Sequence, residues 1–170
     1  MRKDYDFHVY PTYAFHMAES QKDSLMKLNI DLPIGYHFSE AALEEDAKII
    51  TDLSDSLTKQ SHQDFLHNRE MLKRMPYSII KYNNNLVAFE LLDPAGGFRQ
   101  QFVVPEHRGK GLGNAVERNL AQKCIKFGYT PWKLVEVDNK DVIKASMRSP
   151  YWTNLKVDEH PVEFAIARAL

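Results

Sequence analysis

A glycine-rich turn in the second half of the chain constrains its fold more than any other feature. The turn consists of Arg108, Gly109, Lys110, Gly111, Leu112 and Gly113. A strand-like run, FRQQFVV, precedes it, and apolar residues at helical spacing follow it. A helix that begins at such a turn exposes free backbone N–H groups at the positive end of its dipole, and glycine lets a phosphate approach the main chain closely. With Arg108 and Lys110 beside these groups, the turn predicts an anion-binding site.

Patterns on both sides of the turn predict an α/β (α+β) sandwich with a mixed, mostly antiparallel sheet. Before the turn we expect a strand at 34–38, helices at 40–53 and 61–75, and strands at 77–83, 86–93 and 98–104. After it we expect a helix at 112–127, a strand at 132–138, a helix at 140–148 and a last strand pair around Pro161. The expected order is β-α-α-β-β-β-α-β-α-β. If the helix after the turn is a crossover, the strands on either side of it are parallel.

Polar and glycine residues mark where these elements should begin and end. Ser39 and Ser61 are candidate N-caps for the first two helices, and Gly128 should end the helix that follows the turn. Asn83, Asn84 and Asn85 predict a hairpin loop. Residues 33–170 are expected to form one domain. Residues 1–32 are expected to be an N-terminal extension, a linker or partial element that includes a short helix ending before Pro33.

Composition limits the classes of function. Lys plus Arg number 22 and Asp plus Glu number 23, for a net charge of -1, which argues against a nucleic-acid surface. The single cysteine, Cys124, cannot form an intrachain disulfide and lies on an apolar helical stripe, so we expect a buried core thiol. No apolar run approaches the ~20 residues that span a bilayer. We therefore expect a cytoplasmic protein that contacts no membrane.

Histidine spacing gives no sign of a metal site. The chain has 7 histidines, and His62 and His67 are five residues apart, not the four that would place two ligands on one helical face. We expect no metal cofactor. His107, next to Arg108, is expected at the surface.

Three kinds of phosphate-binding turn could explain the glycines. The P-loop string G-x-x-x-x-G-K-[ST] does not occur in the chain. In the dinucleotide pattern G-x-G-x-x-G, the last glycine would fall on Asn114 or Val116, and an antiparallel meander is the wrong context for it. The third kind fits every position. R-G-K-G-L-G resembles the Q/R-x-x-G-x-G/A turn of the GNAT N-acyltransferase superfamily, over roughly residues 33–160 of the chain.

A narrower resemblance is carried by LLDPAGGFRQQFVVPEHRGKGL. This stretch is similar to the C-terminal domain of glycine N-acyltransferase and its relatives, in which D-x-x-G-x-x-R leads into P-E-x-R-G-x-G-L. The matching residues are Asp93, Gly96, Arg99, Pro105, Glu106, Arg108, Gly109, Gly111 and Leu112. Those enzymes move an acyl group from acyl-CoA to an amino acid. One position departs: where they place a glutamate as general base, this chain has Gly97.

The GNAT resemblance implies acyl-CoA or acetyl-CoA as co-substrate and direct attack by an amine on the thioester. Residues 108–113 would hold the CoA pyrophosphate, and main-chain groups of Phe102, Val103 and Val104 would pair with the pantetheine arm. Asn139 falls where the superfamily often has a CoA-contacting asparagine, although an N-cap explains it equally. Tyr151 is a candidate general acid for the leaving thiolate, and packing beside Trp152 is the alternative.

A general base must come from elsewhere than position 97. Glu90 is the first candidate, because a lone acid among apolar strand residues is desolvated and its pKa rises. The alternative is a solvent-facing side chain, with Phe89 and Leu91 toward the core. Gln100 and Gln101 cannot act as bases but could orient a water or substrate.

We expect the partner to be a small-molecule amine or amino-acid acceptor such as glycine. Two other functions stay open at this stage: a catalytically silent acyl-CoA-binding module, which Gly97 favours, and a protein or peptide N-acetyltransferase. The resemblance also leaves a mitochondrial location open, and the sequence leaves a homodimer open.

Overall fold

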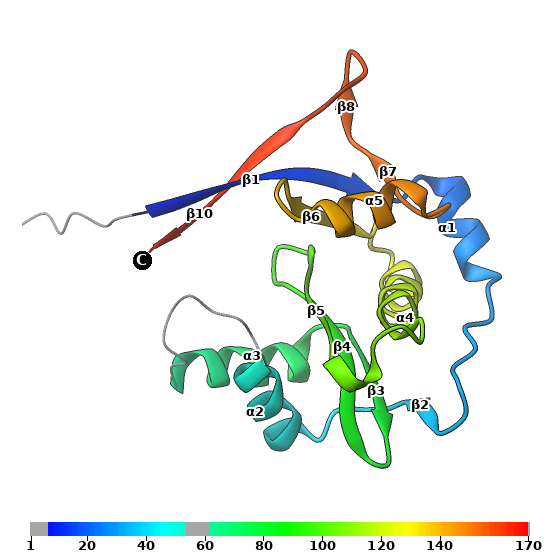
Figure 1. Ribbon diagram of the computed structural model, residues 1–170, viewed down its shortest axis with the longest axis vertical. Helices are drawn as coiled ribbons and strands as arrows, with labels where there is room; N and C mark the ends of the chain where they lie inside the picture. Colours follow the sequence, from blue (N-terminus) through cyan, green and yellow to red (C-terminus); the bar gives the residue numbers. More distant parts are fainter. Residues whose placement is uncertain (1–6, 54–61, 170) are drawn as a thin grey trace, which may run out of the picture.

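The computed structural model describes residues 7–53 and 62–169. Figure 1 shows how their helices and strands are arranged. In chain order the elements are β1 (Phe7–His16), α1 (Glu19–Met26), β2 (Tyr36–Phe38), α2 (Leu43–Leu53), α3 (His62–Arg74), β3 (Tyr77–Tyr82), β4 (Asn85–Leu92), β5 (Phe98–Val103), a short 3-10 helix η1 (Pro105–His107), α4 (Leu112–Lys126), β6 (Trp132–Glu136), α5 (Lys140–Arg148), β7 (Thr153–Asn154), β8 (Lys156–Val157), β9 (His160–Pro161) and β10 (Glu163–Ala169).

The fold is the mixed α/β sandwich that the sequence predicts. The large sheet has the strand order β10-β1-β6-β5-β4-β3-β2, with β7 paired to β1 beside it. Among the strands of the described residues, only β5 and β6 run parallel, and the other pairs of this sheet are antiparallel. The crossover between β5 and β6 is α4, which follows the glycine turn (Figure 1). The predicted parallel junction is therefore confirmed.

Strand β1 changes the interpretation of the N-terminal extension. Residues 7–16 lie inside the large sheet, between β10 and β6, with Tyr13 opposite Val135 and Thr12 opposite Phe164. The expectation of a linker or partial element is wrong for this segment. Pro11 interrupts its strand pattern, and proline within a run normally argues against an inner strand. Here the Pro11 carbonyl still accepts a hydrogen bond from Val137 N at 2.9 Å.

The helix predicted near Leu25 is present as α1 and is fastened to α4. Leu25 is fully buried. The side chain of Gln122, on α4, donates to the carbonyls of Leu25 and Leu28, both at 2.9 Å. These bonds give a side-chain donor to one carbonyl in the last turn of α1 and to another just beyond it. The segment before residue 33 is thus packed on the helix that follows the glycine turn.

The two faces of the sheet are covered by different helices (Figure 1). On β4, Ala88 belongs to the core cluster of Leu112 and Val116 on α4, whereas Phe89 belongs to that of Ile50 on α2 and Met71 on α3. Successive residues of a strand point to opposite faces, so α4 covers one face and the α2–α3 pair covers the other. Both faces of β4 are buried as a result.

Helix α2 begins later than predicted. Its first residue is Leu43, and Ser39 does not cap it, because Ser39 Oγ donates to the carbonyl of Glu40. The Asp46 carboxylate accepts the Ala42 N–H at 2.7 Å instead. An acid three or four residues into a helix can serve a free N–H in this way. The proposed cap at Ser61 lies outside the described residues.

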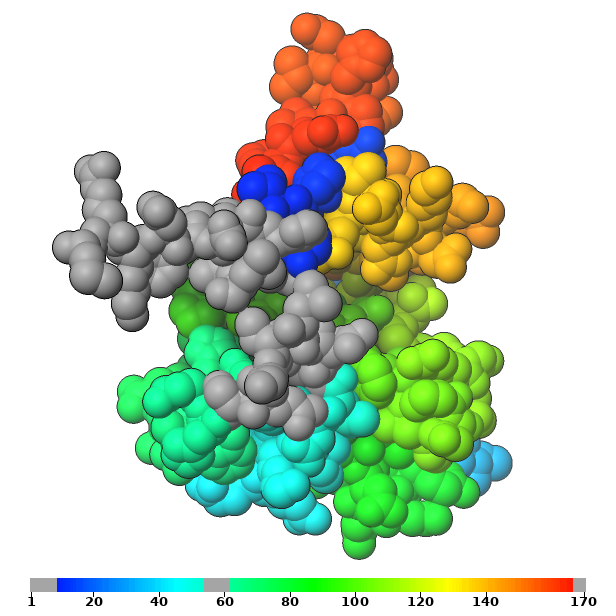
Figure 2. Space-filling view, turned by 60° about the vertical axis from the view of Figure 1, so that its left-hand side comes forward, coloured from blue at the N-terminus to red at the C-terminus, as the bar shows by residue number. Residues whose placement is uncertain are grey.

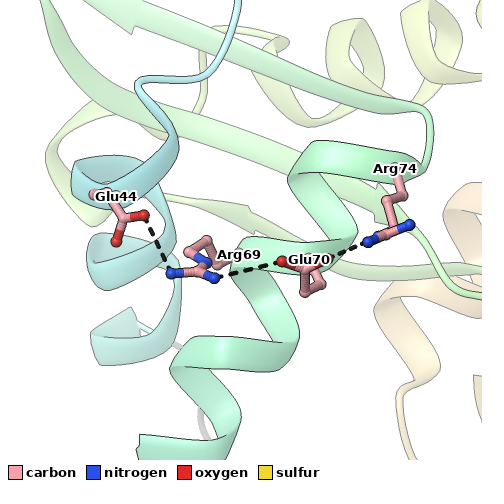
Figure 3. A network of polar contacts seen from close by, with 4 residues as sticks. All are labelled: Glu44, Arg69, Glu70 and Arg74. Atoms are coloured by element: carbon pink, nitrogen blue, oxygen red, sulfur yellow. Dashed lines mark hydrogen bonds and ion pairs between the residues drawn. The ribbon is translucent and has the colours of Figure 1, made fainter.

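Polar contacts also join α2 to α3. Glu44 on α2 contacts Arg69 on α3 at 3.3 Å, and Glu70 lies between Arg69 and Arg74, as Figure 3 shows. Glu44 and Arg74 are exposed and the other two side chains are partly exposed, so each contact contributes little to stability. The buried contact between Asn68 Nδ2 and Thr51 Oγ1, at 3.0 Å, fixes the two helices together more firmly.

The expected turns are present. Asn83 and Asn84 have φ angles of 48° and 64°, the left-handed conformation of a two-residue hairpin turn, while Asn85 already begins β4. Gly128, with a φ of 83°, follows the end of α4 as predicted. The C-terminal strand pair expected around Pro161 is the β8–β9 hairpin, which leads into β10 and stands out from the rest of the surface in Figure 2.

Candidate active site

The glycine turn has the geometry of an anion-binding loop. Gly109 and Gly111 have φ angles of 74° and 79°, which L side chains rarely adopt. A Cβ atom built on either glycine would meet no atom within 4 Å, so the space in front of the turn is open. Gly111 is also the N-cap residue of α4, which begins at Leu112. Backbone conformation, rather than crowding, therefore explains the glycines at these two positions.

Free donors and positive charge gather at this turn. The hydrogen bond from Ala115 N to Gly111 O, at 3.0 Å, is the first of the helix, so the N–H groups of Leu112, Gly113 and Asn114 have no helical acceptor. Arg108 Nε donates to Val103 O at 3.0 Å, and Lys110 Nζ donates to Glu106 O at 3.0 Å. Both cations are thus held beside the turn by carbonyl groups, and an anion can approach them together with the free N–H groups.

An aromatic cluster fixes the segment that leads into the turn. Tyr36 Oη lies 2.8 Å from His107 Nδ1, and the Tyr82 ring lies 5.4 Å from the imidazole. Tyr36 and Tyr82 come from β2 and β3, so these contacts fasten η1 to the edge of the sheet. His107, expected at the surface, packs in this cluster instead.

Strands β5 and β6 separate directly beyond their first pair (Figure 1). Phe98 opposite Lys133 is their one parallel pair among the described residues, whereas β5 stays paired with β4 as far as Val103. The register of β4 and β5 shifts between Phe89 and Leu91, and Gln100 has a φ of 56°, which marks a bulge. The edge of β5 that faces β6 is consequently open to an extended ligand beyond Phe98.

A pocket of about 300 Å³ lies where these two strands separate. It is lined by Glu90, Phe98, Arg99, Gln100, Gln101, Glu117, Lys133, Leu134, Val135, Glu136, Asn139 and Val142. Polar and charged side chains predominate, which is unusual for an inner part of a sheet. A concave site with convergent titratable groups is a candidate for chemistry.

Glu90 is one of these groups and is almost fully buried, with 3% of its surface exposed. Its solvent-facing alternative is wrong, because α4 covers this face of β4 and Phe89 and Leu91 are buried on the other. Gln101 Nε2 donates to Glu90 Oε2 at 3.2 Å and to Gly113 O at 3.2 Å. One side chain therefore links the buried carboxyl to the first turn of α4.

The environment of Glu90 favours its neutral form. Burial raises the pKa of the Glu90 carboxyl well above its ordinary value, and the nearby Glu117 carboxylate raises it further. Lys133 and the hydrogen bond from Gln101 act in the opposite direction. A carboxyl with a raised pKa inside a pocket is suited to accept a proton near neutral pH.

Glu117 and Lys133, which line the same pocket as this carboxyl, were not predicted from the sequence. Glu117 Oε1 accepts from Trp152 Nε1 at 2.8 Å, and Glu117 Oε2 accepts from Lys133 Nζ. The Lys133 ammonium also lies 4.4 Å from the centre of the Trp152 ring. Glu117 and Lys133 come from α4 and β6, the elements that flank the parallel junction. The signal available in the sequence was a charged residue, in each of these two elements, at a position that faces the protein interior.

The remaining predicted site residues lie in different places. Asn139 lines the pocket and also caps α5, since its side chain accepts the Val142 N–H at 3.4 Å. Tyr151 is half-buried, lies 5.3 Å from the Arg118 guanidinium and packs against the core around Trp152. It is not among the described residues that line the pocket. The packing alternative for Tyr151 thus has direct support.

Phe102 and Val103 hold their predicted places on β5, opposite Phe89 and Ala88, and Val104 N donates to Val87 O at 2.9 Å just beyond the strand. Phe102 also lies under the Arg108 guanidinium, 5.7 Å from its ring centre. The strand segment and the glycine turn are therefore in direct contact.

Cys124 is fully buried, and burial raises the pKa of its thiol to about 12, so it is an inert core residue. Within residues 7–53 and 62–169, no group of three or more potential ligands is placed to hold a metal ion. None of the described helices combines the length and the apolar character that crossing a membrane requires.

Comparison with known proteins identifies the family. The model of the acetyltransferase (GNAT) family matches residues 42–146, which include both the glycine turn and Glu90. The chain belongs to this family. GNAT enzymes use acyl-CoA as co-substrate, and the open turn, the separated strands and the pocket are features of this chain that suit such a molecule. No curated protein matches the chain.

Solved structures show the same fold at low identity. A Drosophila protein solved by X-ray crystallography is 14% identical, with a TM-score of 0.72 over 89% of this chain and 52% of its own. A GNAT-family acetyltransferase from Colwellia psychrerythraea is 13% identical, with a TM-score of 0.63 over 96% of this chain and 57% of its own. A GCN5-related N-acetyltransferase-like protein from Streptococcus suis is also 13% identical, with a TM-score of 0.61 over 96% and 63%. The chain thus spans little more than half the length of these proteins.

Proposed function

We propose that this protein is an acyl-CoA-dependent N-acyltransferase that acylates a small-molecule amine or an amino acid such as glycine. One observation carries the proposal: Gln101 connects the buried Glu90 carboxyl to the first turn of the helix that begins at the glycine turn. A CoA anion site and a candidate base are therefore parts of one continuous arrangement. The site predicted at residues 102–104 and 108–113 is kept as the binding site for CoA.

The CoA molecule would occupy two neighbouring regions. Its pyrophosphate would accept hydrogen bonds from the free N–H groups at the start of α4, next to Arg108 and Lys110. Its pantetheine arm would extend along the β6-facing edge of β5, as an added strand does. The thioester would then reach the pocket, where a backbone N–H of β5 could stabilise the developing oxyanion.

Glu90 is proposed as the general base. The acceptor arrives as an ammonium ion, and the Glu90 carboxylate removes one proton from it. The amine then attacks the thioester carbonyl carbon, the C–N bond forms, and the C–S bond breaks as the CoA thiolate leaves. The second proton of the amine nitrogen goes to the thiolate, giving an amide, free CoA thiol and one proton released from Glu90. Holding both reactants in register could supply up to ~7–11 kcal/mol of the acceleration in an ideal system.

Tyr151 and Asn139 have less direct support. Tyr151 remains the candidate to relay this proton: its hydroxyl would protonate the thiolate and regain a proton from the amine nitrogen, although it packs beside the pocket rather than in its lining. Asn139 lines the pocket and would contact CoA from the start of α5. A small acceptor, instead of a peptide, fits the enclosure of Glu90 beneath α4.

A catalytically silent acyl-CoA-binding module is the second candidate. It is favoured by Gly97, since the base of the glycine N-acyltransferases has no counterpart at that position. Turnover decides between the two. The silent module predicts acyl-CoA binding with no thiol release under any amine, whereas the enzyme predicts release that depends on the amine.

The test is a panel of acyl-CoAs and amines, small amino acids included, with release of CoA thiol as the measurement. Turnover by the wild-type chain should fall by at least about a hundredfold in Glu90→Gln, the usual scale for loss of a general base. Glu45→Gln is the matched control, since Glu45 is an exposed acid on α2. Equal rates in the two variants would remove Glu90 from the mechanism. Acylation of peptides but of no small amine would instead favour the hypothesis that the protein is a protein or peptide N-acetyltransferase.

A further inference from the structure

The pocket is lined by two further carboxyls, Glu117 and Glu136, that the proposed reaction does not use. Glu117 lies on α4 and faces the same pocket as Glu90. Both side chains are largely buried, and Glu117 is close enough to act electrostatically on Glu90. Two carboxylates in one enclosed site repel each other, so the site favours placing a proton on one of them. The surroundings of each carboxyl decide which one takes it.

Glu117 is held by strong donors on both oxygens. One oxygen receives the ammonium of Lys133, and the other receives the indole N–H of Trp152 at 2.8 Å. Lys133 is fixed in turn by the face of the same indole ring, 4.4 Å from its nitrogen. These contacts fix the orientation of the Glu117 carboxylate beside Glu90.

Glu90 has a weaker arrangement. Its Oε2 atom accepts from the neutral amide of Gln101 at 3.2 Å. A neutral donor stabilises a carboxylate less than a cation does. The same low-dielectric pocket therefore contains one carboxyl with a cation and an indole N–H, and another with an amide. Such pairs of unlike carboxyls are how enzymes divide acid–base roles.

Charged and titratable groups approach Glu90 from three elements. Arg99 lines the pocket from β5, Glu117 and Cys124 come from α4, and Lys133 and Glu136 come from β6. Of these, Glu117 and Lys133 have opposite charges and bind each other directly. Their pairing places a dipole of fixed direction in the pocket beside Glu90.

We propose that Glu117 and Lys133 form a positioning pair that assigns the exchangeable proton of this cluster to Glu90. Glu90 is then the carboxyl that takes up and releases protons as pH changes or as an acceptor binds. Neither residue of the pair touches the reacting atoms. The inference rests on the proposed role of Glu90 as base, but the pH titration of Glu90 can be measured without turnover.

The two members of the pair have opposite effects on Glu90. Removing the negative charge in Glu117→Gln eases ionisation of Glu90, so the titration of Glu90 moves to lower pH. Removing the positive charge in Lys133→Met has the reverse effect and moves it to higher pH. Lys133→Arg keeps the charge and restores the wild-type titration. The double variant Glu117→Gln/Lys133→Met removes both charges and returns the titration toward wild type.

The experiment is a pH titration of the free protein, with ¹³C-labelled glutamate carboxyl groups followed by NMR. Glu90→Gln and Glu117→Gln identify the two signals by their loss. Asp46→Asn is the matched control, because Asp46 belongs to another buried ion pair, with Lys81 at 2.9 Å, away from the pocket lining. We expect Glu117→Gln to lower the pH at which Glu90 titrates, Lys133→Met to raise it, and Asp46→Asn to leave it unchanged.

Two results would overturn the proposal. One is a Glu90 titration that moves to higher pH in Glu117→Gln, and the other is an unchanged Glu90 titration in both Glu117→Gln and Lys133→Met. If turnover is found, the acid limb of kcat/KM should move with the NMR titration in the same variants. A titration that moves as expected in a protein without turnover would keep the pair and reject the proposed function. If Glu90→Gln abolishes the acid limb of kcat/KM and Glu117→Gln leaves it in place, Glu90 remains the proposed base and the positioning pair is rejected.

Discussion

The indole ring of Trp132 occupies the space that a side chain on Gly97 would need. A Cβ atom on Gly97 would lie 2.9 Å from Cη2 of this ring and within 3.2 Å of two more of its atoms. Real Cβ atoms do not approach so closely, so a glutamate at position 97 would displace the ring. The departure from the glycine N-acyltransferase pattern is therefore built into the packing, and the carboxyl inside the pocket comes from Glu90 instead.

The first prediction concerns this contact. Gly97→Ala should lower the free energy of unfolding by about 1–3 kcal/mol, the usual cost of overpacking. In a Trp132→Leu background the same substitution should cost much less, because the ring is gone. Chemical denaturation of the four proteins in this double-mutant cycle gives the coupling energy. A penalty that is the same in both backgrounds would show that Trp132 does not exclude a side chain here.

The second prediction is a pH-dependent gain in stability for Glu90→Gln. Because the pKa of Glu90 is raised in the folded state, the folded protein binds more protons than the unfolded chain between the ordinary and the raised value. Wild-type stability must fall as pH rises through that window. Glutamine carries no such charge, so the variant should be more stable above the window, by roughly 1–3 kcal/mol.

Thermal unfolding at pH 4 and at pH 8 checks this sign. At the lower pH the two proteins should have similar melting temperatures, and at the higher pH the variant should melt later. A variant that is equally or less stable at pH 8 would mean that Glu90 is not a destabilising buried charge. Loss of activity together with gain of stability is the expected mark of a functional residue.

The third prediction separates the roles of the turn glycines. Gly111→Ala should destabilise the protein by about 1–2 kcal/mol, because its φ of 79° is unfavourable for an L side chain although the space is open. Gly111→Asn should cost less, since asparagine tolerates this conformation. Gly113→Ala should leave stability unchanged or raise it, because its Cβ would make ordinary contacts at 3.6–3.9 Å within a helix. Thermal melts rank the three, and an equal loss in all of them would contradict the conformational explanation.

The fourth prediction compares a buried and an exposed ion pair. Lys81 and Asp46 are buried and 2.9 Å apart, so Lys81→Met should destabilise the protein by about 3–5 kcal/mol by leaving Asp46 uncompensated. Lys48 and Asp52 are 3.0 Å apart but exposed, and Lys48→Met should change stability by less than about 0.5 kcal/mol. Urea denaturation measures both. Equal effects would mean that the burial of Asp46 does not control the cost.

The fold was predictable where local pattern and tertiary structure agree. The asparagines predict the hairpin at Asn83. The helical spacing of apolar residues predicts the helix after the glycine turn, and a helix between two strands predicts the parallel junction. Strand β1 was not predictable, because its pairing with β6 and β10 joins residues more than a hundred positions apart and Pro11 obscures its pattern. The start of α2 was predicted too early, because the Asp46 carboxylate, inside the helix, accepts the Ala42 N–H in place of an N-cap side chain.

The candidate site, like the fold, was predictable only where local sequence patterns identify it. The glycine turn and Glu90 stand out because their residue types are unusual for their local patterns. Glu117 and Lys133 are ordinary charges on a helix and a strand until the crossover brings both beside Glu90. Only the three-dimensional arrangement shows that they face one pocket with Trp152.

The most direct test of this account is a calorimetric titration of the protein with acetyl-CoA, repeated on Arg108→Ala and on Lys126→Ala. Lys126 is an exposed cation at the far end of α4 and serves as the matched control. We expect micromolar binding by the wild type, weakened about tenfold or more in Arg108→Ala, the scale of one charge-assisted contact, and unchanged in Lys126→Ala. Absence of binding by acetyl-CoA and longer acyl-CoAs to the folded protein would contradict the assignment of the glycine turn and the function built on it.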